Sequence, residues 1–171
     1  MTQIKIREWN EKPRTKLRFI KIGDIFCYQF LEEMFVFGQI LGKVNVGHVI
    51  QFFDIFQASP TITVEELSRA QFMGKPIIVD SYTLFDRSPV WSWQIIGHQT
   101  DFDPSPFKDL AFKWGDPNGL QFGKVWLDGR TEPKIFSREE IEDLDWEACV
   151  GSIVYNRILE EELASRENKG V

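Results

Sequence analysis

Three aromatic-rich, apolar segments separated by short turns constrain the fold more than any other feature of the sequence. They cover residues 25–30, 34–41 and 48–56. Residues 31–33 form a short polar connection between the first two segments, and glycines bracket the turn before the third. Strands joined by connections this short pair with each other as antiparallel hairpins. The sequence therefore predicts a three-stranded antiparallel meander.

Two segments carry the same signal for the start of a helix. In each, a hydroxyl residue precedes a glutamate by three positions, as Thr63 precedes Glu66 and Ser137 precedes Glu140. This spacing allows a capping box, in which each side chain accepts a hydrogen bond from the other residue's backbone N–H. We expect the first helix to run to Phe72 and the second to be short and acidic.

A third helix is expected near the C-terminus. Between residues 148 and 166, apolar side chains recur with the period of an amphipathic helix, which predicts one buried face. This apolar stripe consists of Val150, Val154 and Ile158, widened by Ile153 and Leu159.

Further strands are expected around these helices. Alternating apolar and basic residues predict a half-buried strand over residues 18–22. Other apolar runs predict strands over residues 77–80, 90–97, 110–114, 122–127 and 131–136. We expect an α+β fold that is mostly β, with two or three helices, including a C-terminal one, beside a twisted antiparallel sheet. Glycines inside predicted strands favour strong curvature, so the sheet is either open or barrel-like.

The length of the chain fits one domain. It has 171 residues, and no linker-like segment divides it. We expect a single domain over residues 1–171, with a basic N-terminal arm (1–16), a mainly β region with one helix (17–136) and an acidic helical C-terminal region (137–166).

Targeting signals and metal-binding patterns are not evident. The N-terminal residues contain no continuous apolar segment, and no run of ~18 apolar residues predicts a membrane-spanning helix. Cys27 and Cys149 lack CxxC spacing and have apolar neighbours, which predicts buried free thiols in a reducing compartment. His48 and His98 are the two histidines, too few for a histidine-rich metal site. We expect a cytoplasmic protein without membrane association, metal or cofactor.

Charge is unevenly distributed along the chain. The net charge is −6, yet residues 1–22 carry seven basic and two acidic side chains. Residues 137–147 carry six acidic side chains and one basic one. The negative net charge favours a cationic partner and opposes non-specific binding to nucleic acid. The acidic run also fits the solvated face of a helix.

The sequence lacks the common catalytic motifs, including the G-x-S-x-G nucleophile elbow, the phosphate-binding glycine loop and H-E-x-x-H. Either histidine could activate either cysteine, but no spacing supports such a pair. Asp101 and Asp103 could act as an acid–base pair. Beside Pro104, however, they are typical of side chains that cap turns. We predict no catalytic residues, and an enzyme with an unrecognised site remains an alternative.

A nucleic-acid-binding module is a second alternative. An SH3-like barrel entered at Gly23 and Asp24, with exposed aromatic rings and a basic arm, could hold RNA by phosphate neutralisation and base stacking. The basic residues of this arm are Lys12, Arg14, Lys16, Arg18 and Lys21. Basic residues on an edge strand also deter unwanted strand pairing, and the acidic net charge favours that interpretation.

Several segments in sequence order resemble the immunity protein 26 family of bacterial polymorphic-toxin systems. The similarity covers roughly residues 19–125 and leaves out the N-terminal arm and the acidic C-terminal region. The segments that carry it are IKIGDIF (20–26), FVFGQIL (35–41), IQFFDIF (50–56), VEEL (64–67) and WSWQIIG (91–97), which leads into a proline-rich loop.

The resemblance implies a mostly β protein that binds a cognate toxin made beside it and has no catalytic residues. The residues of the shared motifs have structural interpretations. These are a turn at Gly23, turn or capping hydrogen bonds from Asp24, core packing by Trp91 or Trp93 and by Ile96, and a strand exit at Gly97.

If the toxin is a nuclease, its active site is basic because it receives phosphates, and an acidic inhibitor would complement it. The acidic C-terminal run is our candidate for this contact. The predicted toxin-binding residues are Glu139, Glu140, Glu142, Asp143, Asp145 and Glu147.

Overall fold

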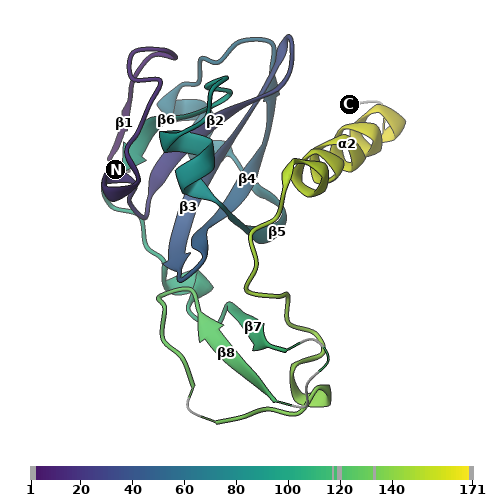
Figure 1. Ribbon diagram of the computed structural model, residues 1–171. Coiled ribbons are helices and arrows are strands. Elements are labelled where there is room, and N and C mark those ends of the chain that lie inside the picture. Colours follow the sequence, from purple (N-terminus) through teal and green to yellow (C-terminus); the bar gives the residue numbers. More distant parts are fainter. Residues whose placement is uncertain (1–2, 117, 119–120, 133, 170–171) are drawn as a thin grey trace.

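A six-stranded antiparallel sheet forms the centre of the molecule (Figure 1). The computed structural model describes residues 3–116, 118, 121–132 and 134–169. The strand order is β1-β6-β2-β3-β4-β5. The strands are β1 (Ile4–Ile6), β2 (Asp24–Leu31), β3 (Met34–Val44), β4 (Gly47–Gln57), β5 (Phe72–Val79) and β6 (Trp93–Gln99).

The predicted meander is confirmed as β2–β3–β4, and the mostly β, α+β class is confirmed with it. The two edges of the sheet are β1 and β5, and over the described residues the sheet does not close into a barrel. Register shifts interrupt the pairing within β2–β3, β3–β4, β4–β5 and β2–β6. Such irregularities increase the twist of a sheet and bend its strands.

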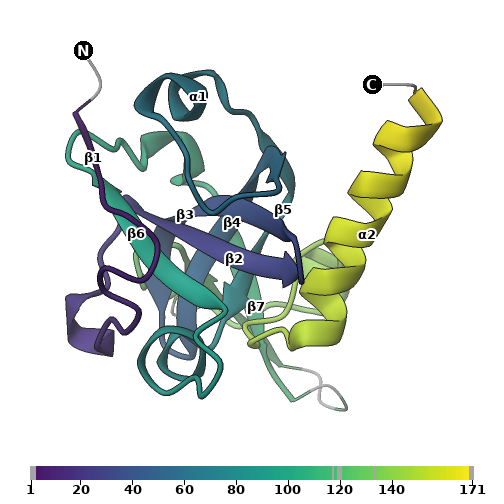
Figure 2. The ribbon, with the colours of Figure 1, turned by 90° about the horizontal axis from the view of Figure 1, so that it is seen from above.

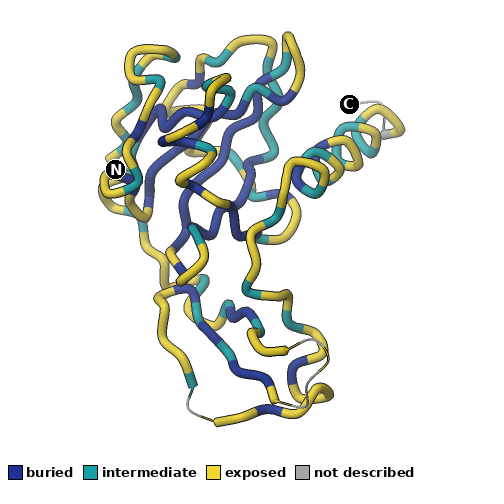
Figure 3. The backbone as a smooth tube through the Cα atoms, in the orientation of Figure 1, coloured by how far each residue is buried: buried dark blue, intermediate teal, exposed yellow. Residues whose placement is uncertain are grey.

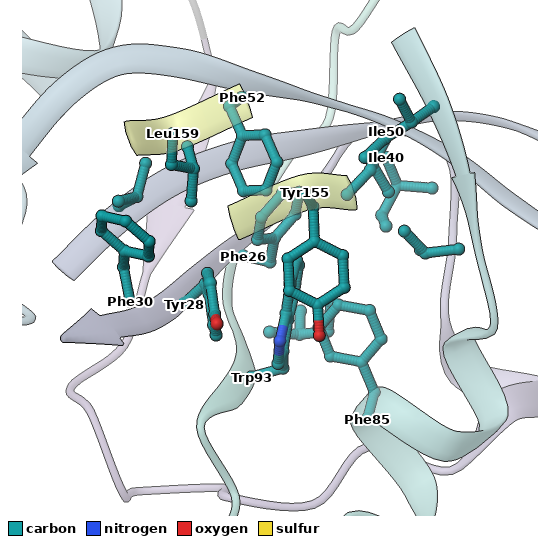
Figure 4. Packing of buried hydrophobic residues seen from close by; sticks show 14 of the residues in the cluster. Phe26, Tyr28, Phe30, Ile40, Ile50, Phe52, Phe85, Trp93, Tyr155 and Leu159 are labelled. Carbon is teal, nitrogen blue, oxygen red and sulfur yellow. The ribbon is translucent and has the colours of Figure 1, made fainter. Parts of the chain in front are cut away.

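Apolar side chains cover both faces of this sheet because neighbouring residues of a strand point to opposite sides. On one face, Phe26 and Trp93 pack against each other and against Tyr155 and Leu159 of the C-terminal helix (Figure 4). On the other face, a second cluster includes Leu67 of the first helix. Burial on both faces explains why the strands are nearly continuously apolar.

The two longer helices lie at different places on the sheet (Figure 2). Helix α1 (Val64–Arg69) begins with the predicted capping box at Thr63 and Glu66. It ends before the predicted Phe72, because that residue pairs with Phe53 in the sheet and stacks on its ring at 4.9 Å. Helix α2 (Ser152–Lys169) is the predicted C-terminal helix.

The strand predicted over residues 18–22 is wrong. A 3₁₀ turn, η1 (Leu17–Phe19), occupies its start. The backbone N–H of Leu17 donates to the Asp86 carboxylate at 3.0 Å, within the π-helical turn η2 (Tyr82–Asp86). The edge of β6 that residues 18–22 could have joined is paired with β1 instead.

A second, two-stranded sheet projects from one end of the main sheet (Figure 1). It consists of β7 (Ala111–Gly115) and β8 (Phe122–Trp126), after the short 3₁₀ helix η3 (Ser105–Phe107). We call the described residues between 111 and 147 the distal lobe. Its apolar side chains Phe112 and Leu127 pack with Leu41 of the main sheet.

The strand predicted over residues 131–136 is reduced to two isolated bridges, Val125 with Thr131 and Phe122 with Phe136. Ile135 in this segment is 58% exposed, so the segment has no continuous apolar face to bury. Pro133 lies outside the described residues. The predicted acidic helix is a single 3₁₀ turn, η4 (Glu139–Ile141).

Two predictions of burial are also wrong. Ile153 is 84% exposed because it lies on the side of α2 away from Leu159, which is fully buried. Cys27 is buried, and burial raises the pKa of its thiol, but Cys149 is exposed. The Cys149 thiol donates to the Val46 carbonyl at 3.0 Å in the segment that leads to α2.

Within the described part of the chain, no helix is long and apolar enough to cross a membrane. Among the same residues, no group of three or more histidine, cysteine, aspartate or glutamate side chains could hold a metal ion.

Candidate functional site

The distal lobe carries three large apolar side chains that are substantially exposed. Trp114 is 45% exposed, Ile135 58% and Trp146 38%. Trp114 and Ile135 line a groove with a volume of about 700 Å³. Figure 3 shows that exposed residues make up more of the lobe than of the main sheet. Exposed tryptophans are typical anchors of protein–protein interfaces.

Both tryptophans are held in place by neighbours in the lobe. The Trp114 indole lies so close to the backbone of Gly123 on β8 that a Cβ atom there would overlap the ring. Trp146 meets the Phe122 ring edge-on at 6.0 Å, and the Lys113 ammonium lies 5.4 Å from its ring centre. These side chains are therefore fixed before a partner arrives, which lowers the entropic cost of binding.

Four of the six predicted toxin-binding carboxylates lie together on this lobe. Glu139 and Glu140 belong to η4, and Glu142 and Asp143 follow it directly; all four are exposed. A capping box holds the turn, because the Ser137 N–H donates to Glu140 at 2.8 Å and the Glu140 N–H donates to the Ser137 hydroxyl at 3.4 Å. We call Glu139, Glu140, Glu142 and Asp143 the acidic turn.

Hydrogen bonds lower the pKa of two carboxylates of the acidic turn. A bond from Lys134 at 2.6 Å, supported by the Ser137 N–H, holds the pKa of Glu140 below its ordinary value. The pKa of Glu139 is also lowered, mainly by a hydrogen bond from its own backbone N–H and by one from Ser137. Both groups therefore stay negatively charged down to a lower pH than an ordinary glutamate.

The remaining two carboxylates are directed toward the main sheet instead. Asp145 and Glu147 flank Trp146, whose segment runs beside β7 through backbone bonds of 2.8 and 2.7 Å to Lys113. The Asp145 carboxylate lies 3.8 Å from the Lys75 ammonium on β5, and Glu147 accepts a bond from the Asn45 N–H at 3.3 Å. The structure thus divides the six predicted residues into four at the acidic turn and two near the main sheet.

The six motif residues that were given structural interpretations are buried or half-buried, in or next to the main sheet. Gly23 has a φ of +87°, and Asp24 caps the turn by accepting from the Lys21 N–H at 2.8 Å. Trp93 and Ile96 are each 1% exposed. At Gly97, a Cβ atom would lie 2.8 Å from the Lys5 carbonyl oxygen of β1.

Trp91 is half-buried and has a φ of +49°, which is uncommon for a bulky residue. These motif residues therefore support the main sheet, whereas the exposed apolar side chains Trp114, Ile135 and Trp146 lie on the distal lobe.

Side chains considered for catalysis have structural partners. The His48 ring lies 2.9 Å from the Ser81 hydroxyl, which is 1% exposed, and His98 lies 2.9 Å from Asp24. Asp103 caps a turn by accepting from the Ser105 N–H at 2.9 Å, as predicted. Asp101 accepts from the Gln3 N–H at 3.0 Å.

The exposed anchors Trp114, Ile135 and Trp146 were not predicted from the sequence. Trp146 had a usable signal, because it is an aromatic residue inside a run of six carboxylates. For Trp114 and Ile135 nothing in the sequence indicated exposure, because each lies in a segment with the pattern of an ordinary strand.

Comparison with known proteins gives one finding. Residues 21–123 match the model of a family described as immunity protein 26. The match covers more than half of the chain, from the turn before β2 to the start of β8. No curated protein and no solved structure matches the chain. The acidic turn lies after the matched segment.

Proposed function

Because the chain belongs to the immunity protein 26 family, as its sequence segments already indicated, we propose that it binds and neutralises a cognate bacterial toxin. It does so in the cytoplasm by occluding the active site or another surface of the toxin. Its role is that of a binding partner, without catalysis and without a cofactor.

The observation that carries this proposal is the surface of the distal lobe. There, Trp114, Ile135 and Trp146 are exposed next to the acidic turn. Apolar anchors set the residence time of a complex, and complementary charge speeds its formation. This combination fits a toxin with a basic binding face, such as the phosphate-receiving active site of a nuclease.

Charge reversal on the acidic turn tests this surface. The variant Glu139→Lys, Glu142→Lys, Asp143→Lys should weaken binding to the toxin domain encoded beside this protein by about tenfold or more, and should flatten its dependence on salt. The matched control Glu32→Lys, Glu33→Lys, Glu160→Lys changes the net charge equally at exposed positions elsewhere. Calorimetric titrations at several salt concentrations measure both effects. If both variants bind like the wild type, this surface is wrongly assigned.

The wider proposal has its own test. Wild-type protein should protect cells that express the toxin domain and should form a complex with it in a pull-down. If it neither binds the toxin nor restores growth, the immunity function is refuted, whichever surface was assigned.

The nucleic-acid alternative loses one of its premises. It relied on an SH3-like barrel, whereas the described sheet is open, with β1 and β5 at its edges. The edge strand that pairs with β6 is β1 (Ile4–Ile6), which contains none of the five basic residues named for the arm, so the interpretation of those residues as the solvent face of an edge strand is also wrong. Retention on single-stranded RNA that is lost when Lys12 and Lys16 are replaced would revive this alternative.

A further inference from the structure

A basic cavity lies on a different part of the molecule from the distal lobe, between the N-terminal segment and β6. Its volume is about 320 Å³. We call it the arm pocket, and four basic side chains contribute to its wall: Lys5, Arg7, Lys12 and Lys21. The whole protein carries a net charge of −6, so this concentration of positive charge is a local feature. A cluster of cations in one concave site attracts an anion.

The arm pocket also contains one carboxylate, Asp24, whose two oxygens are already bonded. One oxygen accepts from the Lys21 N–H at 2.8 Å, and the other lies 2.9 Å from Nδ1 of His98. Asp24 is 5% exposed, and burial raises its pKa. Its acceptor atoms are thus occupied, and four basic side chains against one carboxylate leave the lining of the arm pocket net positive.

Two further features of the arm pocket suit it to a bound anion. The Arg7 guanidinium donates through Nε and Nη2 to the Ile95 carbonyl at 2.8 and 2.5 Å, which fixes it against β6. Thr15 lines the cavity and is 3% exposed, and its hydroxyl has no hydrogen-bond partner among the described residues. Buried hydroxyls without a protein partner are uncommon and often mark a bound water or ligand.

We propose that the arm pocket binds a small phosphate-bearing anion. A phosphate group carries up to two negative charges and several acceptor oxygens, which match several cationic donors around one small cavity. The cavity lies at the small end of the range for ligand pockets, so it fits a single phosphate group with a small substituent. This site does not depend on the proposed toxin contact, because it uses different residues on different elements.

Titration of the full-length protein with inorganic phosphate tests this proposal. At constant ionic strength, the backbone amide resonances of Arg7, Thr15 and His98 should shift and then saturate as phosphate is added. Parallel titration with methyl phosphate distinguishes free phosphate from a phosphate ester with a small substituent, according to which probe saturates at the lower concentration. Shifts that never saturate, or that spread over lysines throughout the surface, would overturn the proposal.

A matched pair of variants separates a site from general charge. Lys5→Gln with Lys21→Gln removes two exposed cations of the arm pocket and should weaken phosphate binding about tenfold. Lys16→Gln with Lys43→Gln removes the same charge from exposed positions outside the cavity and should change binding by less than about twofold. Equal losses in the two variants would mean that phosphate responds to net charge and not to this pocket.

Discussion

At the scale of single residues, contacts on both faces of the main sheet restrict the size of the side chain that fits at each position. Gly38 shows this on β3, because a Cβ atom there would overlap the Phe26 ring and lie 2.5 Å from the Gln51 carbonyl oxygen. The glycine leaves the space in which Phe26 meets Phe52 at 5.6 Å and Trp93 at 5.2 Å. The sequence suggested only that glycines in strands favour curvature. The structure shows that Gly38 also makes room for the Phe26 ring.

His48 should make stability depend on pH. Burial, assisted by the charge of Lys43, lowers its pKa from about 6.5 to about 4. Between these values the unfolded chain binds more protons than the folded one, so the free energy of unfolding falls as the pH falls from about 6.5 to about 4. The loss from this residue approaches roughly 3 kcal/mol.

Urea unfolding of the wild type and of His48→Gln at pH 7 and pH 4.5 measures this contribution. The glutamine can keep a bond to Ser81 but does not titrate. Asp24, whose raised pKa acts in the opposite direction, is present in both proteins and cancels in the comparison. An equal loss of stability on acidification in both proteins would contradict the assignment to His48.

At the scale of elements, the edges of the main sheet are blocked in different ways. The outer strand β5 contains Pro76, which lacks an N–H and is tolerated at a sheet edge. The carbonyl of Ile78 on the same strand accepts from the Val150 N–H at 2.8 Å, so the segment before α2 covers part of that edge. The opposite edge is the three-residue strand β1. Among the residues that the structure describes, neither edge therefore offers a long free template for pairing with another chain.

Helix α2 should contribute to stability through one face. Leu159 is fully buried in the aromatic core, whereas Ile153 is 84% exposed. Leu159→Ala should lower the free energy of unfolding by about 3 kcal/mol, because it removes buried methyl groups and leaves a cavity. Ile153→Ala, on the same helix, should change it by less than about 0.5 kcal/mol. Chemical unfolding of both variants gives these values, and similar losses would mean that α2 docks in another orientation.

At the scale of the whole molecule, charge is separated between two regions. The acidic turn lies on the distal lobe, and the basic side chains of the arm pocket lie beside β6. Our two functional proposals therefore concern surfaces of opposite sign. A toxin with a basic face would be drawn to the lobe and not to the pocket.

We propose that residues 1–171 form one domain that unfolds cooperatively. The distal lobe shares an apolar cluster with the main sheet, to which the lobe contributes Val125 and Leu127 and the sheet contributes Val49. Circular dichroism, which follows the sheets, and tryptophan fluorescence should therefore give the same urea midpoint. The variant Trp9→Phe, Trp91→Phe, Trp93→Phe leaves only the three tryptophans of the distal lobe, Trp114, Trp126 and Trp146, and its two midpoints should still agree with each other. An earlier fluorescence midpoint in that variant would show that the lobe unfolds separately.

Most of the main sheet could be predicted because its signals are local. Strands β2, β3 and β4 follow from apolar runs and short turns, and the capping boxes at Thr63 and Ser137 follow from side-chain spacing. The candidate site was predicted in part. The carboxylates were named from charge alone, but the exposed tryptophans beside them were not, because exposure depends on which neighbours pack against a residue.

What the sequence alone determined is therefore the order of strands β2 to β8, the two capping boxes, the distribution of charge and the family. Tertiary structure decided that residues 17–19 form a turn, that α1 ends before Phe72, that Cys149 and Ile153 are exposed, and that the six carboxylates separate into two groups. The physical reason is the range of the interactions involved. Backbone periodicity and capping act over a few residues, whereas strand pairing and burial depend on segments far apart in the chain.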